Sequence, residues 1–418
     1  MAATVPSTGA DRVHAGGEDG EPARPRSVLM LTPRWARDGG VGAHVQRSAE
    51  LLAREGSRVT VLVARVESEE RIDDVAVLES PRLFDRDATA AARLGDALST
   101  GAEIVHVHQV DDPALIAALR ERAPVVVSAH GYPACTSGVY YFRPGSECTR
   151  GHGPGCVPNL TLRGCAHMRN LARLPSLYAS ATRGRRTLEL ADLVVSYSTS
   201  VDRHLAANEI RERVIVPYFP TMAARTTSAP AGRRRVVFAG RIAHAKGVHV
   251  LIRAAREVEA EFVLCGDGGE LDAMRRLANR YGLEDRVRFT GWLAADALAH
   301  ELAEASVVAM PSVWPEPFGI VGIEGFAAGR PAVATATGGI SDWLEDGISG
   351  LLVSPGDARA LARAVEELLS DPERQDRMGA AGRERALPKF SPERHLQMLL
   401  SGYARAKDRF AVRASPRT

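Results

Sequence analysis

Residues 315–333 read PEPFGIVGIEGFAAGRPAV, which is not the composition of an ordinary buried helix. Two acids, Glu316 and Glu324, enclose a glycine-rich apolar run. The ring of Pro317 disfavours a helical conformation at the preceding residue, so we expect Glu316 in an extended loop. Pro317 itself suits the first position of a helix, and Glu324 would then lie about one turn inside that helix.

The start of such a helix leaves its first amides without partners inside the helix. They would be the amides of Phe318, Gly319, Ile320 and Val321. Their summed dipoles attract phosphate. A ligand with phosphate at its centre and hydroxyl groups at both ends, such as a nucleotide sugar, would fit between Glu316 and Glu324. Two glutamates by themselves would more often be solvated surface acids, and the neighbouring motifs favour the ligand site.

A second loop, FAGRIAHAKG at residues 238–247, follows a predicted strand and supplies two cations. Arg241 could bind a diphosphate as a planar fork and Lys246 as a point charge. The lysine is conspicuous, because the chain has only three lysines among its 53 basic residues. A surface cation of no function is the alternative. We predict that both residues neutralise a diphosphate.

Two more glycine loops follow predicted strands. GGVGAHV (39–45) opens a helix, and FVLCGDGG (262–269) ends in a turn. Glycine lets a ligand approach the backbone closely. The candidates for such contacts are Gly39, Gly40, Gly240, Gly266 and Gly268. The first loop is not G-x-G-x-x-G, and no acid ends the second strand in the expected place, so a nicotinamide cofactor is not expected.

The whole chain alternates short apolar runs with amphipathic stretches. This rhythm predicts parallel sheets covered by helices on both faces. The strand candidates are SVLMLTP, RVTVLVA, EIVHVH, PVVVSAH, LVVSYS and RVIVPYF in the first half, and RRVVFAG, EFVLCG, VRFTG, SVVAMP, PAVATA and GLLV in the second. With 418 residues, we expect an α/β protein of two doubly wound, Rossmann-like domains facing a central cleft.

The domain boundaries follow from composition. We expect a disordered tail at 1–25, an N-terminal domain at 26–217, a Pro/Thr/Ser/Ala-rich linker at 218–233, a C-terminal domain at 234–390, and a last helix at 391–410 that could pack back on the N-terminal domain. The net charge of +2 gives no support for a nucleic-acid partner. No membrane span or signal peptide is recognisable, which predicts a cytoplasmic protein with, at most, peripheral membrane contact.

Together, AGRIAHAKG, GDG and the run from Pro315 to Val353 closely resemble the retaining glycosyltransferases of family four, which have the GT-B fold. The resemblance is densest over residues 235–355. It implies that Arg241 and Lys246 bind the donor diphosphate, Glu316 the sugar hydroxyls and Glu324 the ribose. The helix-start amides would support phosphate and sugar, with Gly39 and Gly40 approaching the diphosphate from the other domain.

His130, in VVVSAHG, resembles the family's histidine that meets the transferred sugar. An acid often follows this position in the family, whereas Gly131 and Tyr132 follow here, so a core histidine is the alternative. The resemblance implies a hexose or N-acetylhexosamine moved to a hydroxyl acceptor with retention. No catalytic cofactor is implied, because two cations and a helix end already face the diphosphate and no D-x-D motif stands in a suitable loop.

Four cysteines crowd into residues 132–170: Cys135, Cys148, Cys156 and Cys165. The segment is rich in glycine and proline, which predicts a long loop without a core of its own. A structural zinc ion would stabilise it, with His152 and His167 as substitute ligands; free thiols, disulfides or a redox cluster are the alternatives. Some family members carry similar insertions, so we expect the segment to shape acceptor choice. Cys265, on a predicted strand, is expected in the core.

Two other functions share the predicted architecture. A nucleotide-sugar epimerase would need no acceptor, and a non-catalytic nucleotide-sugar binding protein would release no nucleoside diphosphate. Thr290, Gly291 and Trp292 could border the donor base. The sequence does not specify the base, the sugar or the acceptor.

Overall fold

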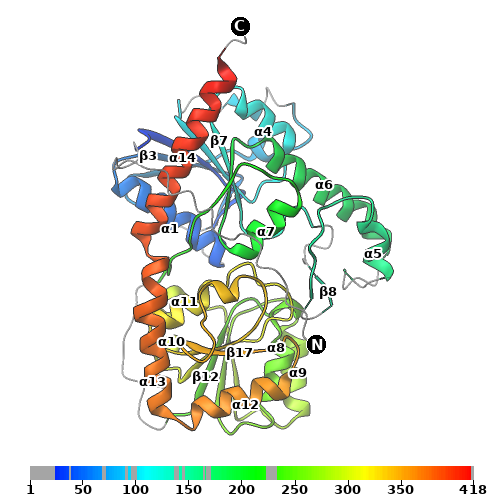
Figure 1. The fold of residues 1–418 in the computed structure, drawn as a ribbon, viewed down its shortest axis with the longest axis vertical. Coiled ribbons are helices and arrows are strands. Elements are labelled where there is room, and N and C mark those ends of the chain that lie inside the picture. Colours follow the sequence, from blue (N-terminus) through cyan, green and yellow to red (C-terminus); the bar gives the residue numbers. More distant parts are fainter. Residues whose placement is uncertain are drawn as a thin grey trace, which may run out of the picture.

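The computed structural model describes residues 24–36, 39–67, 72–89, 93–95, 101–135, 141–143, 146–162, 165, 171–222 and 233–415. The described chain forms two parallel sheets, one in each half, with helices around them (Figure 1). Most of the expected tail, residues 1–23, and the middle of the expected linker, residues 223–232, lie outside the described residues.

The N-terminal sheet has the strand order β11-β10-β7-β6-β1-β3-β5, with all neighbours parallel. Its strands are β1 (Ser27–Leu31), β3 (Arg58–Val63), β5 (Val75–Glu79), β6 (Ile104–His108), β7 (Val125–Ala129), β10 (Leu193–Ser196) and β11 (Arg213–Ile215). The order reverses between β1 and β6. Of these strands, β5 is absent from the sequence expectations. Two short pairs lie outside the sheet: β2 (Arg34–Trp35) with β4 (Arg65–Val66), and β8 (Tyr141–Arg143) with β9 (Ser146–Glu147).

The C-terminal sheet has the order β14-β13-β12-β15-β16-β17 and is also parallel. Its strands are β12 (Arg235–Ala239), β13 (Glu261–Cys265), β14 (Val287–Gly291), β15 (Val307–Met310), β16 (Ala332–Thr335) and β17 (Gly350–Val353). The order reverses between β12 and β15. In open α/β sheets, ligands bind outside the carboxyl ends of the strands at such a reversal.

Helices connect the strands. Those of the N-terminal domain are α1 (Gly40–Arg54), α4 (Pro113–Arg120), α5 (Cys156–Leu162), α6 (Leu174–Leu190) and α7 (Thr199–Ala207), with the 3-10 turns η1 (Pro81–Phe84) and η2 (Leu171–Arg173). The C-terminal half contains α8 (Val248–Ala254), α9 (Leu271–Arg280), α10 (Ala295–Ala303), α11 (Ile320–Ala327), α12 (Ala358–Leu369), α13 (Pro372–Ala381) and α14 (Pro392–Ala414), with η3 (His244–Lys246), η4 (Gly338–Asp342), the π-helical η5 (Gly382–Ala386) and η6 (Leu387–Phe390).

Both faces of the C-terminal sheet are buried. Val237 of β12 belongs to the same apolar cluster as Phe326 of α11, whereas its neighbours Val236 and Phe238 pack in a second cluster with Leu251 of α8. Successive strand residues point to opposite faces, so helices cover both sides of this sheet. The predicted doubly wound α/β class is confirmed.

After α13, which packs on the C-terminal domain, the chain returns to the N-terminal domain, and the last helix, α14, runs along that domain (Figure 1). It contacts α1, β7 and β10 of the N-terminal domain. The hydroxyl of Tyr403 lies 2.8 Å from Nδ1 of His106, and Lys407 pairs with Glu103 at 2.9 Å. The middle of α14, around Tyr403, is thus part of the N-terminal domain's core.

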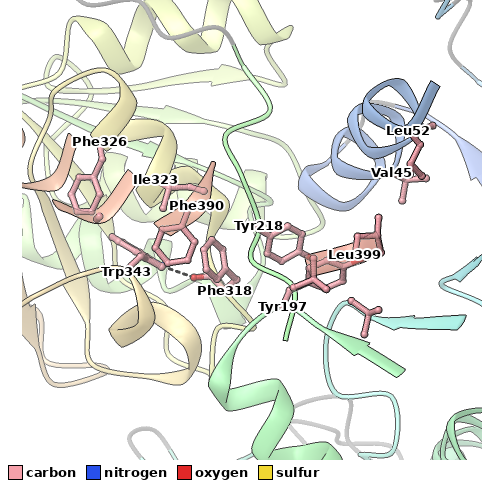
Figure 2. Close-up of a cluster of buried hydrophobic side chains, with 14 of the residues drawn as sticks. Val45, Leu52, Tyr197, Tyr218, Phe318, Ile323, Phe326, Trp343, Phe390 and Leu399 are labelled. Atoms are coloured by element: carbon pink, nitrogen blue, oxygen red, sulfur yellow. Dashed lines mark hydrogen bonds between the residues drawn. The ribbon is translucent and has the colours of Figure 1, made fainter. Parts of the chain in front are cut away.

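Glycines in α11 allow this helix to pack closely against Trp343, the residue after η4, and against β15. A Cβ atom on Gly322 would lie 2.2 Å from Cη2 of Trp343, and one on Gly325 would lie 2.9 Å from a methyl group of Val308. The indole of Trp343 donates to the carbonyl of Phe318 at 2.8 Å, next to the rings of Phe326 and Phe390 (Figure 2). These glycines serve packing between protein elements.

We predict that Gly322→Ala lowers the stability of the protein. Alanine gains about 1 kcal/mol of helix propensity, but the clash with the buried indole costs about 1–3 kcal/mol, so the net effect is destabilising. Urea unfolding measures the change. Gly269→Ala is the matched control, because a Cβ atom there meets nothing within 4 Å; an equal loss in both variants would contradict the packing argument.

Candidate functional site

The central feature of the site is an ion pair between Lys246 and Glu316. Lys246 ends η3, after β12, and Glu316 lies in the loop after β15, so both flank the strand reversal. The ammonium lies 2.7 and 2.8 Å from the two carboxylate oxygens. Glu316 is 4% exposed, so its charge is largely removed from water and requires such a partner.

Two further donors hold the carboxylate of Glu316. The hydroxyl of Ser312 donates at 2.9 Å and the indole N–H of Trp314 at 3.3 Å, both to Oε2. The ammonium of Lys246 also lies 5.9 Å from the centre of the Trp314 ring. The sequence reasoning missed Ser312 and Trp314, although their place just before Glu316 in PSVWPE is a local signal.

The N-terminal ends of α1 and α11 meet at the domain boundary (Figure 1). A Cβ atom on Gly40, the first residue of α1, would lie 3.2 Å from Cδ1 of Ile320, the first residue of α11. Gly39 and Gly319 are the respective N-caps, and neither helix has an acid in its first turn. Two partially positive helix ends therefore lie side by side, and neither is neutralised by a carboxylate in its own first turn. Such a pair of helix ends favours the binding of an anion.

The helix start differs from the prediction, because α11 begins at Ile320 and not at Pro317. Gly319 has a φ of 86°, a left-handed conformation that favours glycine, and a Cβ atom there would lie 2.5 Å from Cε of Met310. Ile320 and Val321 therefore lie in the first turn, whereas Phe318 precedes it. The side chain of Phe318 is 1% exposed and belongs to the core.

Arg241 lies in the loop after β12 and is exposed. Within the described residues, its guanidinium has neither a hydrogen bond nor an ion pair, so it is available to a ligand at this edge of the sheet. The glycines near Arg241 are explained by close contacts within the protein. A Cβ atom on Gly266 would lie 1.9 Å from the carbonyl oxygen of Gly240, and one on Gly268 would lie 2.4 Å from that of Ile242.

Glu324 is buried inside α11 and accepts hydrogen bonds from Thr221, at 2.8 Å from the hydroxyl and 3.3 Å from the amide. Burial raises the pKa of this carboxyl, and the hydrogen bonds from Thr221 oppose the rise. Thr221 lies in the expected linker after the N-terminal domain. Its hydrogen bonds to Glu324 therefore connect the linker to α11. The sequence reasoning did not select Thr221.

Both ring nitrogens of His130 are hydrogen bonded in this structure. Nε2 lies 3.0 Å from Nδ1 of His108, and Nδ1 lies 2.7 Å from the hydroxyl of Tyr218. The ring stacks on Tyr197 at 4.7 Å. His130 would have to exchange one of these bonds before its ring could bind a sugar hydroxyl.

His130, which is partly exposed, belongs to a group of five histidines whose other four members are buried. The group comprises His44, His106, His108, His130 and His395. Burial lowers the pKa of each ring, and neighbouring imidazoles lower it further for every member except His395. The pKa falls to about 3 for His108 and to about 4 for His395, where the hydrogen bond to Pro217 opposes the effect of burial. Nδ1 of His395 donates to the carbonyl of Pro217 at 2.7 Å, because a carbonyl can only accept.

The loops that carry His130 and Glu316 face each other across the domain boundary. A Cβ atom on Gly131 would lie 3.9 Å from Cγ of Pro317, and the rings of Tyr132 and Trp314 are 6.3 Å apart. At a second contact, the carboxylate of Asp342 in η4 accepts from the amide of Thr199 at 2.7 Å. The structure therefore brings the N-terminal and C-terminal site residues to one boundary.

The cysteine segment contains two short strands and α5 rather than loop throughout. Among the residues that the structure describes, which include all four cysteines, no three Cys, His, Asp or Glu side chains are grouped so that they could hold a metal ion. The expected zinc site therefore stays a prediction. Nε2 of His152 lies 2.8 Å from the hydroxyl of Thr182, and His167 lies outside the described residues.

The remaining predicted residues are placed as follows. Cys265 is buried on β13, and burial raises the pKa of its thiol to about 11. Gly291 ends β14 with a φ of 72°, and the hydroxyl of Thr290 donates to its carbonyl at 2.9 Å. Trp292 is 48% exposed directly after this strand, which leaves a large apolar surface open at the carboxyl edge.

Comparisons with known proteins agree with this geometry. Residues 38–218 match the family described as "Glycosyltransferase Family 4", and residues 224–385 match "Glycosyl transferases group 1". The chain belongs to the GT-B glycosyltransferases. The lipopolysaccharide core biosynthesis glycosyltransferase LpsE of Rhizobium meliloti is 37% identical over 177 residues, which cover 41% of this chain and 51% of LpsE.

Solved GT-B glycosyltransferase structures share the fold over most of their length. Sucrose-phosphate synthase of Thermosynechococcus elongatus superposes with a TM-score of 0.70 at 23% identity, over 89% of this chain and 97% of the synthase. Anabaena HepE, solved with UDP-glucose, gives a TM-score of 0.63 at 19% identity, over 90% and 98%. The aligned region spans about half the length of LpsE. In the described part of the chain, no helix is long and apolar enough to cross a membrane.

We predict that the buried histidines make this glycosyltransferase acid-sensitive. Their ordinary pKa is 6.5, but His108 and His395 in the folded protein bind a proton only near pH 3 and 4. Between these values the unfolded chain binds more protons, so the free energy of unfolding falls as the pH is lowered from 7 toward 4. The fall is about 1.4 kcal/mol per pH unit for each histidine.

Urea unfolding at pH 7.5, 6.0 and 5.0 measures this dependence. His395→Gln removes one titrating group and should reduce the slope by about one proton. Equal unfolding free energies at the three pH values would contradict the buried neutral state of the histidines.

Proposed function

We propose that the protein is a retaining glycosyltransferase that moves a hexose or N-acetylhexosamine from a nucleotide-diphosphate sugar to a hydroxyl acceptor. The observation that carries the proposal is the contact between the starts of α1 and α11, which have no acid in their first turns. Lys246 and the exposed Arg241 lie in the loop after β12, which neighbours the strand that leads to α11. A diphosphate is the dianionic group that such a boundary suits.

The leaving group determines where the protein must act. Cleavage of the anomeric bond develops negative charge on the diphosphate and positive charge on the sugar ring. Fixed cations and helix-end amides lower the barrier when they stabilise the developing negative charge. Arg241, Lys246 and the amides of Ile320 and Val321 take this role, with Gly39 and Gly40 approaching from the N-terminal domain.

Binding of the donor would exchange partners around Glu316. The ammonium of Lys246 turns from the carboxylate to the phosphate, and Glu316 then accepts hydrogen bonds from hydroxyls of the donor sugar. Ser312 and Trp314 keep the carboxylate in place during this exchange. Glu324 likewise exchanges Thr221 for the ribose hydroxyls, which compensates the cost of a buried carboxylate that has no cation beside it.

Retention needs no covalent intermediate in this proposal. The departing phosphate oxygen takes the acceptor's proton on the face from which it leaves, and His130 and Glu316 orient the sugar. Catalysis uses no divalent ion, because cations and helix ends already face the diphosphate.

The zinc ion expected at the cysteines takes no part in catalysis. The cysteine segment contacts the C-terminal domain through Glu147, whose carboxylate accepts from the amide of Gly338 at 2.7 Å. The segment therefore borders the boundary where an acceptor would enter.

Glu316→Gln and Lys246→Ala should each lower kcat by at least about a hundredfold, because each removes a charge that acts in the transition state. Release of nucleoside diphosphate in the presence of donor and acceptor measures the effect. Circular dichroism establishes that the variants are folded.

Lys389→Ala is the matched control for the lysine variant. Lys389 forms an exposed pair with Glu345 at 3.5 Å and has no bond to a predicted site residue among the described residues, so its loss should leave kcat unchanged. Undiminished turnover in Glu316→Gln and Lys246→Ala would refute the assignment.

A cognate donor should raise the melting temperature of the protein. A ligand at a hundred times its Kd stabilises the folded state by about 2.7 kcal/mol. A thermal-shift screen should include UDP-glucose, because HepE was solved with it, together with UDP-N-acetylglucosamine and GDP-mannose. Glu324→Gln should abolish the shift. Equal shifts for the free nucleoside and the nucleotide sugars would argue against a site built for diphosphate and sugar.

A further inference from the structure

Tyr218 occupies the point where the two domains and the linker meet. It follows β11, at the start of the expected linker, and yet it is 3% exposed. Figure 2 shows its ring between Phe318 of the C-terminal domain and Tyr197 of the N-terminal domain. The ring centres lie 5.1 Å from Phe318 and 4.3 Å from Tyr197. The residue is thus packed against both halves of the molecule.

The backbone around Tyr218 is fixed on both sides. The carbonyl of Pro217 accepts from Nδ1 of His395 at 2.7 Å, and the ring of Phe219 contacts the same imidazole at 4.8 Å. His395 belongs to α14, which packs on the N-terminal domain. The beginning of the linker is therefore held at this point, and the hydroxyl of Tyr218 has a defined position.

That hydroxyl lies 2.7 Å from Nδ1 of His130, whose other nitrogen contacts His108. The phenol is also close enough to Glu316 for the carboxylate, after burial and Tyr197, to raise the pKa of Tyr218 further. Phe318, which supports the ring, stands two residues after Glu316. Tyr218 consequently connects the histidine of one domain to the acidic loop of the other.

We propose that Tyr218 is a positioning residue of the transfer reaction: its hydroxyl orients the imidazole of His130, and its ring on Phe318 keeps that imidazole in register with the loop of Glu316. The inference rests on the proposed function, in which both residues contact the donor sugar. Neither the family resemblance nor the motifs selected this residue. A small displacement of the reacting groups lowers the rate of transfer steeply. The loss of this hydrogen bond should therefore lower the rate.

The chain supplies a matched control. Tyr197 is also 3% exposed and also stacks on His130, at 4.7 Å, but its hydroxyl pairs with Ser128 at 2.7 Å and not with the imidazole. Tyr197→Phe and Tyr218→Phe therefore each remove one buried hydroxyl from the same cluster. Only the second removes a partner of His130.

The first test observes His130 directly. In protein labelled with ¹⁵N-histidine, His130 is assigned by the signals that disappear in His130→Asn. Tyr218→Phe should shift the Nδ1 signal of His130, and Tyr197→Phe should leave it in place. An Nδ1 signal that is the same in Tyr218→Phe and in the unmodified protein would overturn the proposal.

The second test is kinetic, with the donor selected by thermal shift and release of nucleoside diphosphate as the readout. Tyr218→Phe should lower kcat about tenfold, the equivalent of one oriented hydrogen bond, with the donor KM within about threefold. Tyr197→Phe should retain kcat. An unchanged kcat in Tyr218→Phe, or an equal loss in both variants, would overturn the role in the reaction.

The two proposals fail in different ways. Absence of transfer by the unmodified protein would overturn the proposed function and, with it, the kinetic role of Tyr218. An active unmodified enzyme with an equally active Tyr218→Phe variant would leave the proposed function standing and overturn this inference.

Discussion

The ion pair of Lys246 and Glu316 is the interaction on which the C-terminal site depends. Its two loops follow β12 and β15, which are neighbours in the sheet although they are far apart in the chain. At this reversal the connecting segments leave in opposite directions, so side chains from both loops can meet above the sheet edge. The ammonium of Lys246 offsets the cost of burying the charge of Glu316, and a cation held there is in place for a phosphate in the proposed function.

The domain boundary is built around residues that connect both halves. His395 of α14 holds Pro217, Tyr218 reaches His130, and Thr221 holds Glu324. Tyr218 and Thr221 therefore take part in hydrogen bonds of the candidate site, although their composition predicted only a linker between the domains. A change in the relative position of the domains would alter these hydrogen bonds directly, which gives a physical route from domain movement to the geometry of the candidate site.

Most glycines of the loops that resemble the family motifs allow two elements of the protein to pack closely against each other. Gly266 accommodates the carbonyl of Gly240, Gly322 the indole of Trp343, and Gly319 the thioether of Met310. The motif is specific because several elements require close packing at once, and a Cβ atom at any of these positions would displace a neighbour. In the proposed function, the chemistry resides in the few charges and helix ends that this packing brings together.

The sequence by itself determined the fold class, the two domains and the segments that carry the charged site residues, because strand periodicity, glycine and lysine placement are local signals. It missed β5, a short strand at the sheet edge with partly exposed residues. It also placed the start of α11 three residues too early, because Gly319 takes a left-handed conformation as the N-cap of α11, which the apolar pattern does not reveal. Only the tertiary structure decided the ion pair, the contact of α1 with α11 and the position of Tyr218 between the two domains. These depend on which strands are neighbours and on where α14 packs.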